Sequence, residues 1–391
     1  MKKKKKKKPH VRWKQRLKSR MCLRQRFQRT PTMHAFAPHA ALTRCLQYDE
    51  EKCVTASDVG PHSLKYWDMH DLCYLPPSDR GPTPIAQLNE QQVRTFQYEN
   101  ERNLLVHSSG DSIKVQPLYY NYDDEENSKN RRTGRVLVGH RNLVWTLHFE
   151  KECLATGSRD HRILVWDLEY GKRVSKLKGH GSDVRCLRLS HDTIVSAGDD
   201  GQLGLWDKRK KWGLVTFLPS YSNQGWACQF DEDKIMCNGR TQKGGDDGVL
   251  FWDRRKLQVR LWLSAHRSKT QPPSLLGARD TICYARYNES LLLSSTRSNE
   301  LQIWEMEEIL TKTEPQPLNV FHPFPSIRNT VNSGILHFQF DKDKVVAACC
   351  NTESTLFVLD FDHKKKEEEE AKEEEAEAEE GEEEMYHNNN T

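Results

Sequence analysis

Two neighbouring stretches of the sequence repeat the same order of apolar runs and turns. Residues 136–170 read VLVGHRNLVWTLHFEKECLATGSRDHRILVWDLEY, and residues 177–207 read LKGHGSDVRCLRLSHDTIVSAGDDGQLGLWD. In both stretches a Gly-His pair is followed by three short apolar segments, which alternate or are β-branched and end in Gly/Asp turns. Such segments are typical of β-strands. Each stretch therefore predicts three strands, with a fourth running into the next Gly-His position.

The same unit can be followed along most of the chain. Its terminal tryptophan position recurs at intervals of 40 to 55 residues, at Trp67, Gln116, Trp166, Trp206, Trp252, Trp304 and Leu359. A period of this length indicates a repeat fold, and seven units predict seven sheets. From about residue 30 to residue 362 the pattern resembles the WD-repeat family. This resemblance implies an all-β fold, a seven-bladed WD40 β-propeller.

The predicted ring needs a closing strand. The repeat pattern ends directly after residues 357–360, so the last unit supplies only three strands. In the family that the sequence resembles, the N-terminus usually lends the missing outer strand, so we expect residues 29–37 to close the ring and protect its sheet edge. Three regions are predicted: a basic extension with a short helix at 1–28, the propeller at 29–362, and an acidic, disordered tail at 363–391.

The charge of the chain is concentrated at its two ends. Residues 1–30 contain fifteen Lys or Arg and no Asp or Glu, and residues 364–384 contain thirteen Glu and four Lys. The net charge of +4 therefore describes the ends and not the repeats. The basic run at residues 2–8 could be a nuclear signal or a nucleic-acid contact. Aromatic residues are few there and charge runs are usually solvated, so a nucleic-acid partner is not expected.

Several classes of function are disfavoured by motifs that the sequence lacks. No apolar run reaches the ~18–20 residues of a membrane span. No P-loop, hydrolase or zinc motif is present. The eleven cysteines are odd in number and form no C-x-x-C motif, which predicts a reducing compartment, the nucleus or the cytoplasm or both. We therefore expect a protein that is not an enzyme and that has no metal, no cofactor and no membrane partner.

Two units carry four polar residues that match the hydrogen-bonded network of WD repeats. The two sets are His140, Thr156, Asp160 and Trp166, and His180, Ser196, Asp200 and Trp206. Their expected role is structural, because they would satisfy an indole N–H and an imidazole buried inside a blade. Units two, five, six and seven lack the Gly-His pair, so we expect their networks to be incomplete.

A ligand of a propeller binds on its loop faces or at the rim of its channel. One repeated position at the start of the inner strands reads Arg44, Arg94, Trp145, Arg185, Trp226, Cys283 and Leu336. A second position, just before the turn Asp, includes Arg159 and Arg297, and both positions are expected to face the same end of the channel. Guanidinium groups beside indole rings suit an acidic or phosphorylated peptide. Alternatively, these arginines stack on Trp or pair with Asp of neighbouring blades. The candidate peptide-binding residues are Arg44, Arg94, Trp145, Arg159, Arg185, Trp226 and Arg297.

The segment before the repeats suggests a narrower family. Residues 11–28 place Trp13, Leu17 and Met21 on one face of a basic helix. This helix and the closing unit resemble F-box/WD-repeat proteins, the substrate receptors of Skp–cullin–F-box ubiquitin ligases. The resemblance implies Skp–cullin partners, and Arg159 and Arg185 match positions at which some members hold a phosphorylated degron. An F-box needs about 40 residues and only ten precede Val11, so we expect the F-box to be missing or to lie outside this sequence, and Skp binding depends on it. The alternative interpretation is that the helix is a generic basic extension with no link to this family.

Two other interpretations compete with this one. The sequence contains two Trp-Asp-x-Arg motifs, which end at Arg209 and Arg255 in successive repeats. Receptors of the cullin-4 ligase carry such pairs on the opposite face of the propeller, where the Arg contacts the adaptor. The remaining interpretation is a WD40 scaffold without any link to a ligase. All three predict a protein or peptide partner.

Overall fold

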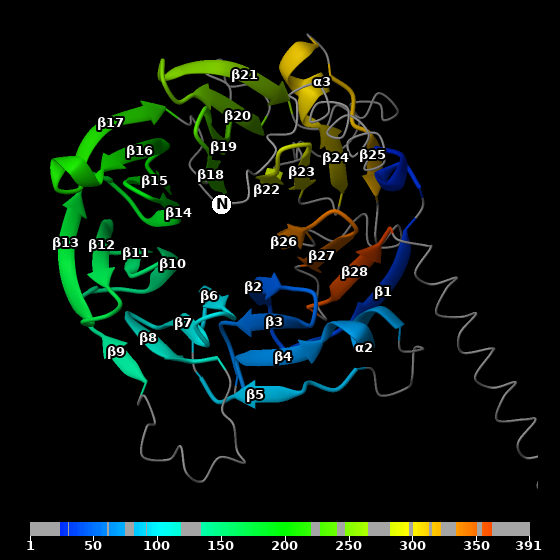
Figure 1. Ribbon diagram of the computed structural model, residues 1–391, viewed down its shortest axis with the longest axis horizontal. Coiled ribbons are helices and arrows are strands. Elements are labelled where there is room, and N and C mark those ends of the chain that lie inside the picture. The colour runs from blue at the N-terminus through cyan, green and yellow to red at the C-terminus, as the bar shows by residue number, and fades with distance from the viewer. Residues whose placement is uncertain are drawn as a thin grey trace, which may run out of the picture.

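Seven antiparallel sheets of four strands each are arranged in a ring around a central channel (Figure 1). The computed structural model describes residues 24–29, 31–60, 62–74, 82–90, 92–118, 134–219, 227–240, 247–264, 282–296, 300–312, 315–321, 334–349 and 354–361. The seven-bladed propeller that the sequence predicts is thereby confirmed, with the repeated Trp position on the third strand of every blade.

The first three blades follow one another in the chain. Blade one comprises β2 (Thr43–Tyr48), β3 (Lys52–Ser57), β4 (Leu64–Asp68) and β5 (Ala86–Leu88). Blade two comprises β6 (Phe96–Glu99), β7 (Leu104–Ser109), β8 (Ser112–Pro117) and β9 (Arg135–Leu137). Blade three comprises β10 (Val144–Glu150), β11 (Cys153–Ser158), β12 (Arg162–Asp167) and β13 (Lys172–Lys178).

The other four blades complete the ring. Blade four comprises β14 (Val184–Ser190), β15 (Thr193–Gly198), β16 (Gln202–Asp207) and β17 (Gly213–Pro219). Blade five comprises β18 (Cys228–Phe230), β19 (Lys234–Arg240), β20 (Asp247–Asp253) and β21 (Gln258–Ser264). Blade six comprises β22 (Ile282–Tyr287), β23 (Leu291–Thr296), β24 (Leu301–Glu305) and β25 (Asn319–Phe321). Blade seven comprises β26 (Ile335–Phe340), β27 (Lys344–Cys349), β28 (Leu356–Asp360) and β1 (Thr32–Phe36).

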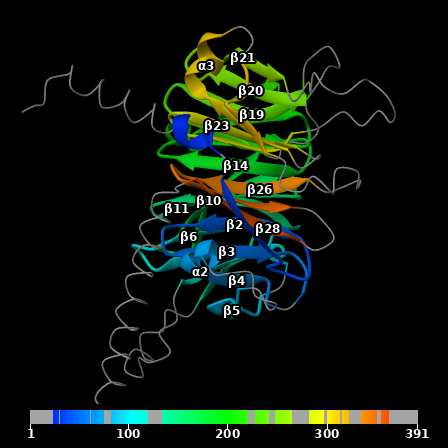
Figure 2. The same cartoon turned by 90° about the vertical axis from the view of Figure 1, so that its right-hand side faces the viewer.

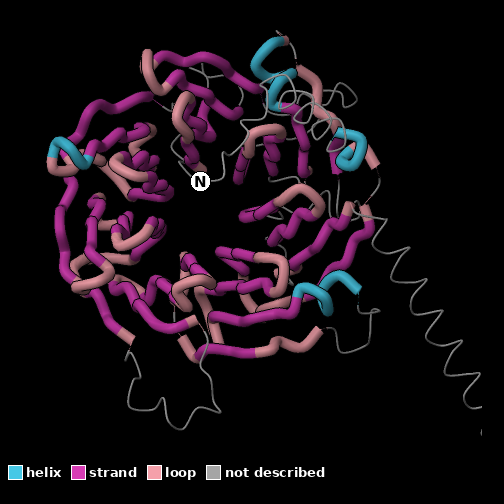
Figure 3. The backbone as a smooth tube through the Cα atoms, viewed as in Figure 1, coloured by secondary structure: helices cyan, strands magenta, loops and turns pink. Residues whose placement is uncertain are grey.

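The short helices of the described chain lie at the outer edge of the ring (Figure 3). They are α2 (Met69–Tyr74), the 3₁₀ turn η2 (Lys208–Lys210) and α3 (Met306–Thr311), and residues 24–27 are also helical. Trp13, Leu17 and Met21 of the predicted basic helix, and the acidic tail from residue 362, lie outside the described residues. None of the described helices has the length and apolar character needed to cross a bilayer.

The hydrophobic core lies between the blades. Seven clusters of buried side chains are present in the described residues, and each is shared by two neighbouring blades. The second strand of a blade is buried on both faces, as in β15 and β27, whereas an outer strand such as β13 is mostly exposed. The sequence follows this gradient, with β-branched and aliphatic runs in the middle strands and charged residues at the outer edge.

The N-terminal strand closes the ring as the sequence predicts, although it is shorter than residues 29–37. β1 pairs with β28 in an antiparallel register that runs from Thr32 opposite Asp360 to Phe36 opposite Leu356. Figure 2 turns this seam toward the viewer. The preceding helical turn is anchored by Phe27, which is fully buried and packs on Phe361 with 4.5 Å between the ring centroids. Closure therefore uses both a strand and an aromatic anchor.

Candidate functional site

The third blade contains a complete hydrogen-bonded network behind its inner strand. The imidazole Nε2 of His140 lies 2.8 Å from the Thr156 hydroxyl, and the Trp166 indole N–H donates to the same hydroxyl at 2.9 Å. The other imidazole nitrogen lies 3.1 Å from the Asp160 carboxylate. Each buried polar group is thus paired, which avoids the desolvation cost of an unpaired one.

The network recurs in blade four and changes in the other blades. In blade four the His180 imidazole lies 2.7 Å from the Ser196 hydroxyl and 2.9 Å from the Asp200 carboxylate. The Trp206 indole N–H donates to the same hydroxyl at 2.9 Å. Blade one has a His–Thr–Trp set that sequence analysis missed, because Pro38 replaces the expected Gly: His39 and Trp67 each lie 2.9 Å from Thr55. In blade five Cys237 stands at the hydroxyl position, and the Trp252 indole has no hydrogen bond of normal geometry.

The network gives the fold an acid sensitivity through Asp160. Burial by itself would raise the pKa of this carboxyl, but hydrogen bonds from His140 and from the backbone N–H groups of Arg141 and Arg162 outweigh it and lower the pKa to about 2. Because the folded pKa lies below the unfolded value of about 3.9, this contribution to stability is complete above pH ~4 and is lost as the pH falls toward 2.

We therefore expect the melting temperature to fall between pH 4 and pH 2, and the variant Asp160→Asn to show a flatter decline over the same range. Differential scanning fluorimetry across this pH series measures both. The control is Asp111→Asn, since Asp111 is an exposed turn residue. An equal acid slope in wild type and Asp160→Asn would contradict the assignment.

The predicted Arg/Trp residues do meet at one end of the channel, which we call the top face. Trp145 of blade three lies between two guanidinium groups, with its ring centroid 4.3 Å from the Arg94 carbon Cζ and 4.1 Å from the Arg185 Cζ. Arg94 lies two residues before β6, and Trp145 and Arg185 are the second residues of β10 and β14. Their common position in the repeat brings them to the same height. The result is an Arg–Trp–Arg stack across three blades, stabilised by cation–π contact.

Three aspartates hold this stack from the turns around it. Arg44 donates to Asp58 at 2.9 Å, and Arg94 lies 3.5 Å from the same carboxylate. Arg185 donates to Asp199 at 2.7 Å. The Asp183 carboxylate accepts from the Trp145 indole at 3.2 Å and also lies 3.6 Å from Arg185 and 3.9 Å from Arg159. The geometry thus contains both parts of the alternative, stacking on Trp and pairing with Asp, and the contacts Arg94–Asp58 and Arg159–Asp183 join neighbouring blades.

The burial of these side chains decides which charge faces outward. The side chains of Arg44, Arg94, Arg159 and Arg185 are 35, 19, 56 and 26% exposed. Those of Asp58, Asp183 and Asp199 are 7, 14 and 20% exposed. Asp58 and Asp183 are therefore less exposed than all four arginines, whereas Asp199 is about as exposed as Arg94, and four positive side chains face three negative ones. A ligand that approaches the top face meets oriented N–H donors and an indole.

Two of the predicted peptide-binding residues, Trp226 and Arg297, lie outside the described residues. Cys283, at the equivalent position of blade six, is buried. The described part of the candidate site is therefore formed by blades one to four.

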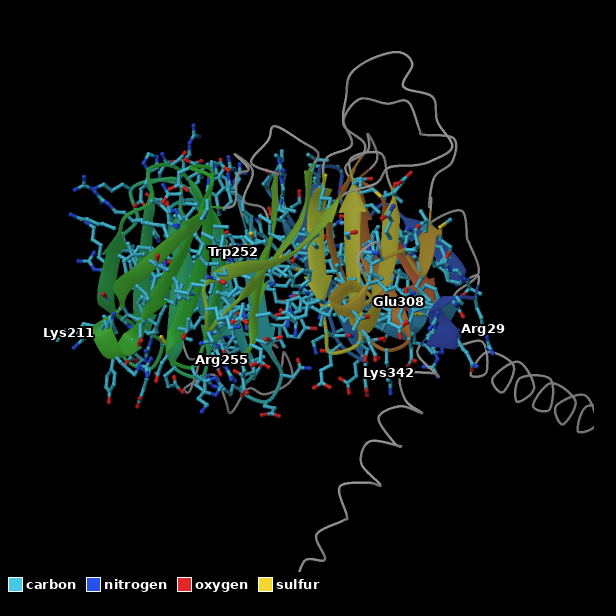
Figure 4. The ribbon with its side chains drawn as sticks, turned by 90° about the horizontal axis from the view of Figure 1, so that it is seen from above. Arg29, Lys211, Trp252, Arg255, Glu308 and Lys342 are labelled. Atoms are coloured by element: carbon cyan, nitrogen blue, oxygen red, sulfur yellow. The ribbon has the colours of Figure 1, made fainter. Side chains whose placement is uncertain are left out.

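The two Trp-Asp-x-Arg motifs lie on the opposite face. Strands one and three of a blade run parallel, so the end of the third strand is at the far side from the top face. Arg209 pairs with Asp207 at 2.8 Å and Arg255 with Asp233 at 3.0 Å, and both Arg side chains are 79% exposed. Figure 4 shows Arg255 at one edge of the disc, on the same side as Lys342. Both arginines are accessible to a partner.

The channel contains a cavity of about 350 Å³, lined by the stack residues Arg94, Trp145 and Arg185 and by residues further along the inner strands. Its walls come from the inner strands of every blade except blade five, and they include residues that sequence analysis missed, among them Arg188, Arg286, His148 and His337. His148, Arg188 and Arg286 share a second repeated position on the inner strands, whereas His337 directly follows Leu336, the first repeated position of blade seven. We find no group of three or more His, Cys, Asp or Glu side chains suited to a metal ion among the described residues.

Comparison with known proteins agrees with this geometry. The family described as "WD domain, G-beta repeat" matches residues 131–167 and 171–207, which end at the third strands of blades three and four. The chain is a seven-bladed β-propeller, and two of its four-stranded blades carry WD40 repeats. This fold generally serves as a protein-binding scaffold and is typically non-catalytic.

The relatives carry different names. The chain is 25% identical to serine-threonine kinase receptor-associated protein of Gallus gallus over 191 residues, 48% of this chain and 45% of the relative. It is 24% identical to WD repeat and SOCS box-containing protein 1 of Mus musculus, over 40% of this chain and 42% of the relative. It is 30% identical to a ribosome biogenesis protein WDR12 homolog of Ixodes scapularis, over 36% of this chain and 34% of the relative. The chain spans less than half the length of these curated relatives.

Proposed function

We propose that this propeller is a substrate receptor of a cullin-RING ubiquitin ligase of the Skp–cullin–F-box type, and that its top face binds an acidic or phosphorylated peptide. The observation that carries the proposal is the stack in which Trp145 separates the guanidinium groups of Arg94 and Arg185. The peptide would place its carboxylate or phosphate on the Arg donors and an apolar side chain against the indole.

The physical case rests on preorganisation. An exposed Arg loses side-chain entropy when it binds an anion, whereas these guanidinium groups are already oriented by the aspartate carboxylates and by the indole. Guanidinium forks match carboxylate and phosphate oxygens bidentately. Trp and Arg are also the residues that most often dominate binding energy at protein interfaces. A peptide with one negative group beside an apolar residue fits both features.

The ligase part of the proposal rests on resemblance. The segments at both ends of the repeats resemble F-box/WD-repeat proteins, and one relative, WD repeat and SOCS box-containing protein 1, combines WD repeats with a second named module. A receptor would use the top face for substrate in the nucleus or the cytoplasm. A second candidate, a cullin-4 ligase receptor, is favoured by the exposed Arg209 and Arg255 on the opposite face.

Affinity capture from lysate, read by mass spectrometry, tests the proposal with three proteins. These are wild type, Arg94→Ala/Arg185→Ala on the top face, and the matched control Arg209→Ala/Arg255→Ala on the opposite face. We expect Skp and cullin-1-type subunits with all three proteins, and loss of a subset of preys only with the top-face variant.

The other outcomes are equally informative. Cullin-4 subunits that are lost only with Arg209→Ala/Arg255→Ala would replace the first candidate by the second. If no ligase subunit is captured by any of the three proteins, the ubiquitin proposal is wrong and the scaffold assignment remains. If the top-face variant retains every prey, the peptide site lies elsewhere.

A further inference from the structure

The inner strands carry a second repeated position, three residues after the top-face residues. In blades one to seven it reads Gln47, Gln97, His148, Arg188, Gln229, Arg286 and Gln339. Because a strand rises about 3.3 Å per residue, this position lies roughly 10 Å further along the channel than the Arg–Trp–Arg stack. It forms a separate level of the channel wall.

The four glutamines at this level clamp each blade to the next one. The Gln97 amide donates to the Phe149 carbonyl at 3.1 Å and accepts from the N–H of the same residue at 2.8 Å. Gln47 and Gln229 hold Tyr98 and Tyr287 in the same way. The equivalent clamp from Gln339 to Tyr48 joins blade seven to blade one. His148 accepts one bond from the Leu189 N–H at 3.4 Å.

Arg188 and Arg286 break this pattern. A guanidinium group has no acceptor and cannot form the two-way clamp. No hydrogen bond or ion pair joins either side chain to another residue in the described ranges. This distinguishes them from the top-face arginines, each of which has an Asp partner. Both side chains line the channel cavity.

The cavity around these two arginines offers positive charge and no negative charge. Its described lining includes no Asp or Glu, and it includes His148, His337 and Tyr284. The Nδ1 atom of His337 is buried without a hydrogen-bond partner among the described residues. Burial, together with the nearby guanidinium groups, holds the pKa of both histidines well below the ordinary value. Each imidazole is therefore neutral at pH 7 and keeps one N–H donor.

Arg188 and Arg286 are half-buried. Two such cations that share one cavity, with no counter-ion among the described residues, destabilise the protein because partly desolvated charge is costly without one. An anion between them removes this cost. We propose that the channel binds a small oxyanion of the phosphate class, free phosphate or the phosphate group of a small molecule, between Arg188 and Arg286. Guanidinium forks match phosphate oxygens, and neutral imidazoles add N–H donors. The cavity of about 350 Å³ has room for one such group with water. The top-face residues Arg94, Trp145 and Arg185 line the same cavity, but the proposed oxyanion lies three residues further along the inner strands than the proposed peptide.

The repeat itself supplies the test variant, Arg188→Gln/Arg286→Gln, which restores the residue used by four blades. We expect sodium phosphate and pyrophosphate to bind full-length wild type in isothermal titration calorimetry. They should raise its melting temperature by about 4 °C at a hundredfold excess over Kd. Binding by the double Gln variant should be at least about 30-fold weaker. Without anion its melting temperature should equal or exceed that of wild type, since the clamps can re-form.

Two control variants separate the channel from other basic surfaces. Arg209→Gln removes one exposed positive charge on the opposite face and should leave phosphate binding unchanged. Arg94→Gln/Arg185→Gln removes two top-face charges and should also retain it. A larger increase in melting temperature with pyrophosphate than with phosphate would indicate a ligand with more than one phosphate, and the reverse order would indicate free phosphate.

Several results would overturn the proposal. They are no binding of either anion to wild type, equal binding by the double Gln variant, or loss of binding only in the top-face variant. A lower melting temperature of the anion-free double Gln variant would assign Arg188 and Arg286 a structural role instead. A Glu-rich peptide with the sequence of residues 367–384 that competes with phosphate and binds more tightly would replace the small oxyanion by an acidic segment.

Discussion

Removal of residues 1–37 should leave the protein unable to fold to a stable ring. The truncation deletes β1, which pairs with β28 over five residues, and it deletes the buried Phe27. Loss of a buried Phe alone costs about 3–5 kcal/mol, and the bare edge of β28 loses its hydrogen-bond partners as well. Since a typical domain is stable by only about 5–15 kcal/mol, the combined loss is comparable to the whole stability. Thermal unfolding and size-exclusion chromatography measure the result.

The control for this truncation removes residues 1–22 only, so that Phe27 and β1 remain. We expect this shorter truncation to melt at the same temperature as the full chain and to elute as a single species. The point variant Phe27→Ala should lie between the two. If the chain without residues 1–37 melted cooperatively at the wild-type temperature, the N-terminal strand would not be what closes the ring.

Replacement of Trp145 by Ala should weaken binding of a captured peptide partner by about 30-fold or more. The indole contacts both Arg94 and Arg185 and donates to Asp183, so its removal frees two guanidinium groups and also deletes the apolar contact surface. A buried Trp at an interface often contributes 2 kcal/mol or more, which corresponds to roughly this factor. Titration calorimetry with the partner peptide measures the loss.

Trp145→Phe is the matched control, because it keeps an aromatic ring face for both guanidinium groups and loses the indole N–H and the second ring. Its affinity should lie between wild type and Trp145→Ala. The melting temperature of each variant shows whether the blade remains folded. Unchanged affinity of a folded Trp145→Ala protein would remove the stack from the binding site.

Much of the fold could be predicted because successive blades repeat the same order of apolar strands, turns and buried polar residues. The spacing from His140 to Trp166 and from His180 to Trp206 specifies the turns, and the apolar runs between them specify the strands. The closing strand followed from the missing fourth strand of the last unit. The aromatic anchor before that strand could not be predicted, since a lone aromatic such as Phe27 in a basic segment carries no repeat signal.

The candidate site was only partly predictable. Alignment of the repeats placed Arg94, Trp145 and Arg185 at one height, but it could not decide whether they would stack or bind Asp. That outcome depends on turn residues such as Asp183, whose contacts cross between blades. The channel arginines were within reach of the same alignment, three residues further on. The glutamines at the equivalent positions look like ordinary polar residues until their bonds to the next blade are seen.

The seam of the ring also determines the order in which the protein can fold. Most contacts join neighbouring segments, but the closing contacts do not: the hydroxyl of Thr32 reaches the Asp360 carbonyl across 328 residues, and the Gln339–Tyr48 clamp spans 291. Contacts of such long sequence separation carry a large loop-closure entropy and form late. On the ribosome the first blades can assemble in order, while the seam must wait until β28 has been synthesised. Until then β1 has no partner strand, and this interval is when the nascent chain is most open to chaperones and to misassembly.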